Sequence, residues 1–369
     1  GEKWTSLSTV TWEKTKTFNI GLDMALWNSK LTIGADYFIQ KTEDMLLGMP
    51  QPGSFGLSGS PTLNAGTVEN KGLELVINHR NNVGEVYYHI GANATFLKNE
   101  LTKVNGDRDE WTGFNPHGKG AITYAKTGYP IGFFNLIKSD GIFQSEEEIR
   151  AYVDKNGNMI QPKAQPGDLK FVDYNGDGQI NDLDRQDCGS SFPKVTLGLN
   201  LGAEWRGLDA NLFFDSSLGH KIYNAQYYTT VYNEVTGNQY AERLNSWTEN
   251  NRNTDIPRYV KGTDDNGTNW AYIDRWLESG SFFRLKTLEV GYTLPKAWVN
   301  KAKLQNVRIY TAMENLFTIT SYKGYTPDLG TVDADGAGTS GGSGVLTRGC
   351  DDGRYPSART MTFGLQVNF

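Results

Sequence analysis

Apolar and polar residues alternate along several long stretches of the chain. Between positions 17 and 27, the apolar side chains stand at every second position, at Phe18, Ile20, Leu22, Met24 and Leu26. A period of two places these side chains on one face of a β-strand. The segment has about ten residues, which is enough to cross a bilayer when the strand is tilted. The pattern therefore predicts a membrane-spanning strand with one continuous apolar face.

The same alternation recurs, so we predict about nine spanning strands. The further segments are 31–39, 73–78, 88–96, 195–205, 208–215, 288–294, 307–313 and 361–369. Their connections alternate between short turns, after Trp27, Arg80 and Trp205, and long polar segments, after Lys41, Lys98, Leu218 and Phe317. Short periplasmic turns and long extracellular loops are typical of an outer-membrane barrel. The predicted fold class is therefore all-β, a transmembrane antiparallel β-barrel.

Several segments between the strands have local patterns of their own. The aromatic segment 128–134 is assigned to a loop, as a local hairpin. Counting it as a span would place the strand ends at Trp27 and Phe369 on opposite sides of the membrane. Segment 145–153 is predicted as a short helix, because Ser145 suits an N-cap and three glutamates follow it. A brief helix is expected near Trp298, and 99–192 is expected to form one long extracellular loop.

Composition and charge exclude several classes of protein. The net charge is −6 and the isoelectric point about 5.4, which gives no electrostatic footprint for nucleic acid. Mean hydropathy is −0.52, and no stretch approaches the roughly 18 apolar residues of a membrane helix. The four histidines lack metal-ligand spacing and no phosphate-binding loop follows a strand, so we predict that the chain is not an enzyme. A soluble β-sandwich also alternates, but its strands have about five or six residues.

The segment 173–184 matches the twelve-residue calcium-binding loop. Oxygen ligands would come from Asp173, Asn175, Asp177, the backbone carbonyl of Gln179, Asn181 and Asp184. Gly178 at position 6 would take the sharp turn. Position 12 departs from the pattern, because Asp reaches less far than Glu. Calcium would be structural and would pin a long loop, whereas the competing interpretation is a metal-free loop rich in Asx-turns.

The two cysteines, Cys188 and Cys350, both fall in predicted extracellular loops. An oxidising environment allows a disulfide to persist. A bridge between them is one expectation, and two unpaired thiols are the other. Two cysteines are in either case too few for a disulfide framework.

Seven strings in the same order resemble the C-terminal part of SusC/RagA-type TonB-dependent outer-membrane transporters. They are FNIGLD at 18–23, GTVENKGLEL at 66–75, GYPIG at 128–132, GIFQ at 141–144, PGDLK at 166–170, the calcium-like loop at 173–184 and ENLF at 314–317. Each string alone is weak, but seven in order over essentially the whole chain are specific. The sequence thus resembles the last part of a much larger barrel.

The resemblance implies a 22-stranded barrel in the outer membrane, of which residues 1–369 supply about nine C-terminal strands. It implies partners that this chain does not contain: an N-terminal plug and the early strands of the same transporter, TonB acting through that plug, and a SusD-like surface lipoprotein. The implied cargo is an oligosaccharide or a peptide. A nine-stranded open sheet would leave two unpaired edges in lipid. We therefore expect the chain to be a fragment or one of two pieces, with another polypeptide completing the barrel.

Two other functions stay open at this point. One is a TonB-dependent receptor for siderophores or vitamins. The other is a secreted, soluble, calcium-binding β-rich module that binds glycans. Loop aromatics at Tyr223, Tyr227, Tyr228 and Trp270 suit stacking on sugar rings and packing against a lid protein equally well.

Overall fold

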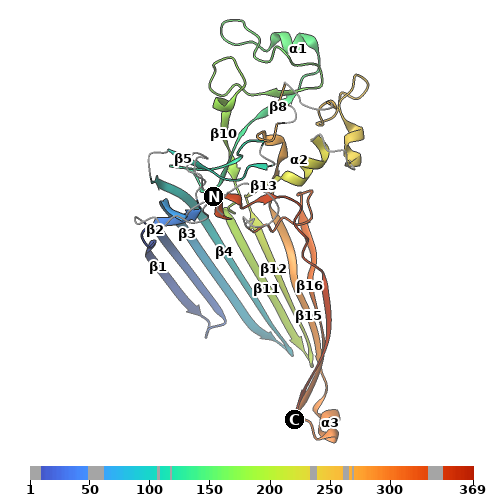
Figure 1. The fold of residues 1–369 in the computed structure, drawn as a ribbon. Coiled ribbons are helices and arrows are strands. Elements are labelled where there is room, and N and C mark those ends of the chain that lie inside the picture. Colours follow the sequence, from blue (N-terminus) through green and yellow to red (C-terminus); the bar gives the residue numbers. More distant parts are fainter. Residues whose placement is uncertain are drawn as a thin grey trace, which may run out of the picture.

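Nine long strands form one antiparallel sheet in the computed structural model (Figure 1). The structure describes residues 10–48, 62–105, 109–116, 119–232, 239–260, 266–267, 270–330 and 344–369. Within these ranges the order is β1-β2-β3-β4-β11-β12-β15-β16-β18. The bounds are β1 Lys14–Leu26, β2 Leu31–Gly48, β3 Thr62–Val83, β4 Val86–Val104, β11 Val195–Trp205, β12 Leu208–Leu218, β15 Phe282–Thr293, β16 Asn306–Thr320 and β18 Thr360–Asn368. All nine predicted strands are confirmed.

Short connections lie at the lower end of the sheet in Figure 1, as the connection lengths predicted. The β1–β2 turn places Trp27, Asn28 and Ser29 at positive φ, and Gly84 has φ of 61° between β3 and β4. We expected that second turn at 81–84. Strand pairing instead continues to Val83 opposite Val86, so the loop is only two residues long. Helix α3, Lys296–Val299, caps the β15–β16 connection as expected, followed by a 3₁₀ turn at Asn300–Ala302.

Long connections at the upper end fold into a separate loop assembly of small sheets and helices. The first sheet consists of β10 Arg185–Ser190, β7 Phe133–Ile137, β6 Thr123–Lys126 and β5 Glu110–Thr112. The second consists of β14 Leu277–Ser279, β13 Lys221–Asn224 and β17 Cys350–Asp351. The third pairs β8 Ser139–Ile142 with β9 Leu169–Phe171. The helices are α1 Glu146–Ala151 and α2 Ala225–Tyr232, with 3₁₀ turns at Asp182–Asp184, Ala241–Asn245, Asp274–Trp276 and Gly344–Thr347. β6 pairs with β7, so a local hairpin forms as predicted, but most of segment 128–134 is its turn. Ser145 caps α1, as expected.

The apolar face of the nine-stranded sheet is exposed along its whole height. Ile20 is 62% exposed, Ile309 52% and Phe363 75%. The main buried core lies instead in the loop assembly. A soluble protein does not leave so large an apolar surface uncovered, whereas a barrel wall turns it to lipid. The exposed face therefore identifies the lipid-facing side of the sheet.

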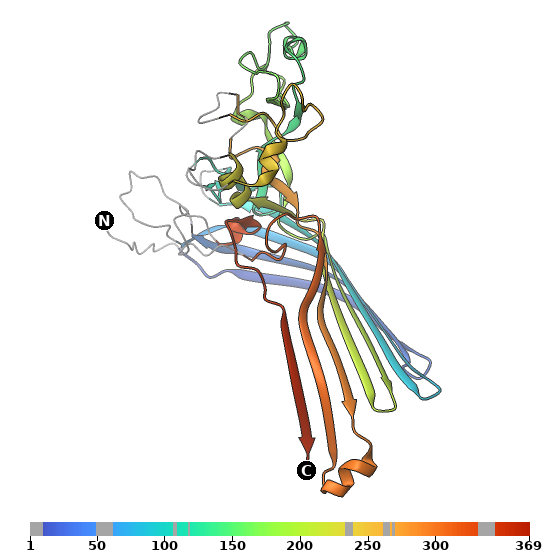
Figure 2. The ribbon, with the colours of Figure 1, turned by 90° about the vertical axis from the view of Figure 1, so that its right-hand side faces the viewer.

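The sheet stays open within this chain. Among the described residues, β1 pairs only with β2 and β18 only with β16. Figure 2 shows the sheet from the side as a twisted wall that runs from β1 to β18. Within the described ranges, no helix has the length and apolar character needed to span a membrane.

The direction of the two faces can be tested at the centre of β11. Leu199 belongs to the exposed apolar face, and its cross-strand partners are Ala92 and Phe214. We expect Leu199→Arg to lower the free energy of unfolding in a bilayer by about 2–4 kcal/mol, because a guanidinium near the midplane must be dehydrated. Urea titration with heat-modifiable gel migration would measure it. Asn200→Arg on the opposite face is the control, and an equal loss there would contradict the assignment.

Candidate functional site: the polar sheet face and the loop assembly

The polar face of the sheet is flattened by side chains that lie across glycines of neighbouring strands. The side chain of Asp36 covers Gly21, that of His89 covers Gly202, and that of Tyr310 covers Gly364. A Cβ added at any of these glycines would collide with the covering side chain. Glycine on this face therefore makes room for a polar or aromatic neighbour. Sequence reasoning noted these glycines only as members of the polar face.

Arg308 on β16 ties three strands together on the polar face. Its Nη2 donates to Glu289 Oε1 on β15 at 2.6 Å, and its Nε donates to Asp209 Oδ1 on β12 at 3.0 Å. The guanidinium reaches β12 by passing over Gly291 of the intervening strand, where a Cβ would lie within 2.5–2.6 Å of it. The absence of a side chain at Gly291 is thus what allows the bridge.

A second arginine anchors a loop to the sheet. Arg284 on β15 is nearly buried, and it donates from Nε to Asp215 Oδ1 on β12 at 2.9 Å. Its Nη2 also donates to Asp328 Oδ2 at 3.0 Å, in the connection that follows β16. The two carboxylates face the guanidinium of Arg284, and this pairing offsets the cost of burying its charge. The loop after β16 is therefore held against the upper rim of the sheet.

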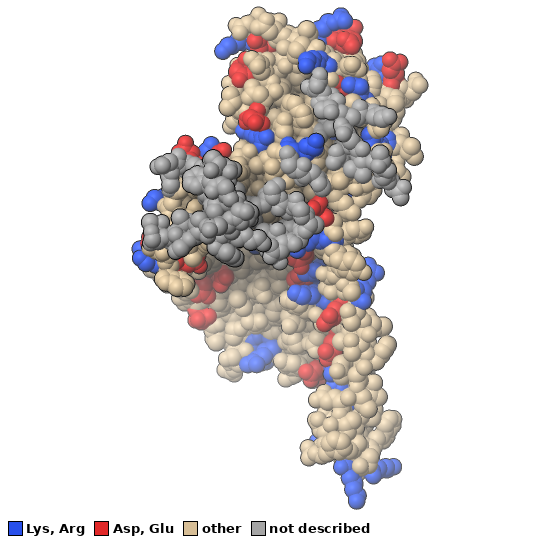
Figure 3. All heavy atoms as spheres, in the orientation of Figure 1, with Lys and Arg blue, Asp and Glu red and all other residues tan. Residues whose placement is uncertain are grey.

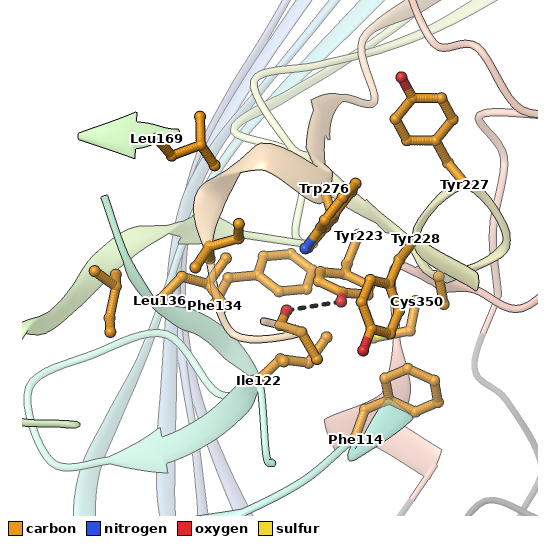
Figure 4. Close-up of a cluster of buried hydrophobic side chains, with 14 of the residues drawn as sticks. Phe114, Ile122, Phe134, Leu136, Leu169, Tyr223, Tyr227, Tyr228, Trp276 and Cys350 are labelled. Carbon is orange, nitrogen blue, oxygen red and sulfur yellow. Dashed lines mark hydrogen bonds between the residues drawn. The ribbon is translucent and has the colours of Figure 1, made fainter. Parts of the chain in front are cut away.

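Buried aromatic side chains fill the centre of the loop assembly (Figure 4). Tyr223 and Trp276 are fully buried, and Tyr228 is 3% exposed. The hydroxyl of Tyr223 donates to the carbonyl oxygen of Ala271 at 2.7 Å, so this polar tip is satisfied. Tyr223, Tyr227 and Tyr228 are thus core residues, which corrects the expectation that they are available for stacking. Their burial arises from contacts between different loops, which the sequence pattern could not reveal.

Trp270 is the one aromatic of that predicted group that the structure leaves partly exposed. Its ring stacks on Phe171, with centroids 6.0 Å apart, and on Tyr272, with centroids 5.2 Å apart. It borders a cavity of about 430 Å³, together with Lys163 and Gln179. A flat aromatic surface beside polar groups suits either a ligand or a partner protein.

The string PGDLK builds a buried ion pair in the loop assembly. Gly167 has φ of 95°, and a Cβ there would press into Trp247 and Arg258. The next residue, Asp168, is fully buried and pairs with the guanidinium of Arg258. The carboxylate also accepts hydrogen bonds from Gln165 N at 2.8 Å and from Asn266 Nδ2 at 2.7 Å. This carboxylate fastens segments that are about 90 residues apart.

The calcium-like loop is closed by its own hydrogen bonds. Asp173 accepts from Gly176 N and Gly178 N, both at 2.8 Å, and Gly178 has φ of 84°. Asp184 is fully buried and accepts from Tyr174 N at 2.9 Å and from Asn181 N at 2.8 Å. Among the described residues, no three His, Cys, Asp or Glu side chains converge as a metal-binding group.

The remaining predicted ligands point along the same loop. Asn175 Oδ1 accepts from Asp177 N at 2.8 Å, and Asp177 Oδ1 accepts from Gln179 N at 2.9 Å. Asn181 caps the 3₁₀ turn by accepting from Leu183 N at 2.8 Å. Hydrogen bonds at alternate residues wrap the chain as the motif requires. A carboxylate or amide oxygen has two lone-pair positions, so a single hydrogen bond leaves one position open.

Cys188 and Cys350 are free thiols, so the disulfide, one of the two expectations, is not formed. Cys350 is completely buried on β17, where it pairs with Tyr223 of β13, and the thiol of Cys188 donates to Leu136 O at 3.7 Å. Burial raises the pKa of Cys188 to about 12, which keeps the thiol protonated and unreactive. Both sulfurs act as small apolar groups in the core of the loop assembly.

The chain is similar to TonB-dependent receptors along nearly its whole length. It is 32% identical over 361 residues to TonB-dependent receptor P3 of Formosa agariphila, and 26% identical over 365 residues to TonB-dependent receptor SusC of Bacteroides thetaiotaomicron. Each match covers 97% of this chain, but 34% and 32% of the relatives. The chain therefore spans about a third of the length of these curated relatives. No family model matches it.

Solved structures with a similar fold share about as much sequence identity with this chain as the curated relatives do. The RagAB peptide transporter is matched with a TM-score of 0.73 and 26% identity, over 97% of this chain and 36% of that chain. The RagAB peptide importer in its closed-closed state is matched with a TM-score of 0.72 and 25% identity, over 100% of this chain and 38% of that chain.

The buried ion pair of the loop assembly gives a stability prediction. We expect Asp168→Ala to destabilise the loop assembly by about 3–5 kcal/mol, because it leaves the largely buried charge of Arg258 without its partner. Limited proteolysis and hydrogen exchange of the loops would report the loss. Asp140→Ala is the matched control, since that exposed carboxylate lies 3.9 Å from Lys170 and contributes little. Equal protection of both variants would contradict the prediction.

Proposed function

Because the chain belongs to the SusC/RagA-type TonB-dependent receptors of the outer membrane, we propose that it forms the last nine strands of a 22-stranded importer barrel. The plug domain and the early strands would come from another part of the same protein. The observation that carries the proposal is the open sheet with its exposed apolar face, which follows the RagAB fold over 97% of the chain. The matched relatives are receptors and transporters, and the chain is accordingly not an enzyme.

The polar face would line the interior of the barrel and face the plug. Its long side chains lie flat over glycines, so the wall leaves room for a folded domain. The arginine bridges across β12, β15 and β16 would keep this wall in shape while the plug rearranges. The short turns would then face the periplasm and the loop assembly the cell exterior.

The loop assembly would seat a SusD-like surface lipoprotein, and TonB would drive import through the plug. The assembly has its own aromatic core, so it can present a fixed surface to a lid. The proposed cargo is an oligosaccharide or a peptide. RagAB, which matches in fold, is a peptide transporter, and SusC matches in sequence.

Uptake measurements would test the importer and separate it from the siderophore or vitamin receptor. We expect deletion of the complete receptor to abolish growth on one class of oligosaccharide or peptide, because cargo of this size needs active transport. An uncoupler should stop uptake in the wild type, and the receptor should copurify with a lipoprotein from detergent extracts. A growth defect confined to iron- or vitamin-limited medium would favour the other receptor class, and purification without detergent would favour the secreted module.

We also propose that the loop 173–184 binds calcium as a structural ion. Its support is the motif and the way the loop wraps, with Gly178 at positive φ where position 6 must turn. Asp173, Asn175 and Asp177 would supply side-chain oxygens, Gln179 its carbonyl, and Asn181 and Asp184 would close the site. The ion would stiffen the tip of the loop assembly.

Calcium should therefore protect this loop. We expect added calcium to slow proteolysis of the loop assembly in the wild type, and a chelator to reverse the effect, because the ion binds only the folded loop. Asp177→Asn should reduce the protection, since it removes one negative charge from the ligand set. Asp182→Asn is the control in the same loop, at a non-ligand position paired with Arg185. Equal calcium protection in both variants would refute the site.

A further inference from the structure

Strands β2, β3 and β4 are much longer than their neighbours, and their upper ends change character. They have 18, 22 and 19 residues, against 11 for β11 and for β12. On the lipid-facing side, the apolar row gives way at this level to charged residues on β1 to β4. We call this surface the lysine band, and it consists of Lys14, Lys16, Lys41, Lys71 and Lys98, with Glu43, Glu69 and Glu100 among them.

Like charges stand opposite one another at three places in the lysine band, and opposite charges at two, where Lys14 faces Glu43 and Lys41 faces Glu69. Lys16 is the cross-strand partner of Lys41, and Lys71 is the partner of Lys98. Glu69 likewise faces Glu100. Directly opposed like charges destabilise a sheet, so these three contacts do not favour strand pairing. The three like-charge contacts indicate a role of the band outside the sheet.

The ion pairs within the band hold the carboxylates back and leave the ammonium groups outermost. Lys71 Nζ lies 2.7 Å from Glu69, and Lys98 Nζ lies 2.8 Å from Glu100, along the same strand. The side chains of these two lysines are 46% and 74% exposed, against 24% and 33% for the glutamates. Five lysines also outnumber three glutamates. The surface that a ligand meets is therefore positive.

The height of the band coincides with the end of the apolar surface. Ile39 pairs with Phe18 on one side and with Lys71 on the other, so apolar and cationic side chains share one row across the strands. Leu73 and Phe96 continue the apolar surface below Lys71 and Lys98. A molecule that touches both must have an anionic head directly above an apolar tail.

We propose that the lysine band binds the phosphate of a phosphorylated glycolipid of the outer leaflet, with its acyl chains against the apolar face below. This inference rests on the proposed orientation, in which the loop assembly faces the exterior. Lysine suits the role because its ammonium is a compact point charge that binds phosphate. The acyl contact distinguishes the lipid from free phosphate, which has nothing to place on Phe18 and Leu73.

Lipid binding by charge variants of the whole receptor would test the proposal. The probe is synthetic monophosphoryl lipid A, titrated into detergent-solubilised receptor and counted by native mass spectrometry. We expect Lys71→Gln/Lys98→Gln to weaken binding by roughly tenfold or more. Glu69→Gln/Glu100→Gln should strengthen it. Lys301→Gln/Lys303→Gln, at the opposite end of the sheet beside α3, is the control and should bind as the wild type does.

Three results would overturn the proposal. They are equal affinity of the wild type and the Lys71/Lys98 variant, equal affinity for the dephosphorylated lipid, and full competition by inorganic phosphate alone. Heat-modifiable migration checks that each variant folds. If the Lys71/Lys98 variant does not fold, the affinity of the Glu69/Glu100 variant still tests whether the lysine band binds the lipid. Cargo uptake is measured in parallel. If the wild type imports cargo normally but does not bind the lipid, only the proposal for the lysine band fails. If the wild type does not import cargo, the importer proposal fails.

Discussion

The need to satisfy every backbone hydrogen bond without water governs this molecule. In a bilayer core an unpaired N–H or C=O has no solvent partner, so strands can cross only as members of a closed sheet. Here each interior strand pairs along its spanning length with both neighbours, from β2 through to β16. The two outer strands, β1 and β18, each lack one neighbour among the described residues. The sheet is consequently a wall segment whose stability depends on further strands.

The two faces of the sheet differ in what their side chains contact. The apolar face meets lipid and needs no specific partner, so its side chains are simply large and evenly spaced. The polar face must instead hold its shape, and it does so through bridges such as Arg308 to Asp209 and Glu289. Figure 3 shows charged side chains over the loop assembly, along the strands and at the tip around α3.

The sequence predicted the sheet far better than the loop assembly. A strict period of two is a local signal, and it located all nine strands and the direction of their apolar face. The turn after β3 was misplaced because Asn81 and Asn82 favour turns locally, yet pairing with β4 keeps them in the strand. Tyr223 and Tyr228 were misjudged because their burial depends on Trp276, far along the same connection, and on Cys350, which comes from the connection after β16. For the same reason the sequence left the state of Cys188 and Cys350 open.

Some contacts of the loop assembly join segments that are far apart in the sequence, and these contacts can form only late in folding. The hydroxyl of Thr123 in the first large loop donates to Leu346 O at 2.6 Å, across 223 positions of sequence. Tyr223 N in the next large loop donates to Gly349 O, in that same late segment. Contacts of such long range form last, because the intervening chain must first be in place. The loop assembly consequently locks only after the connection to the final strand arrives, so a firmly closed loop assembly reports that the strands beneath it are in place.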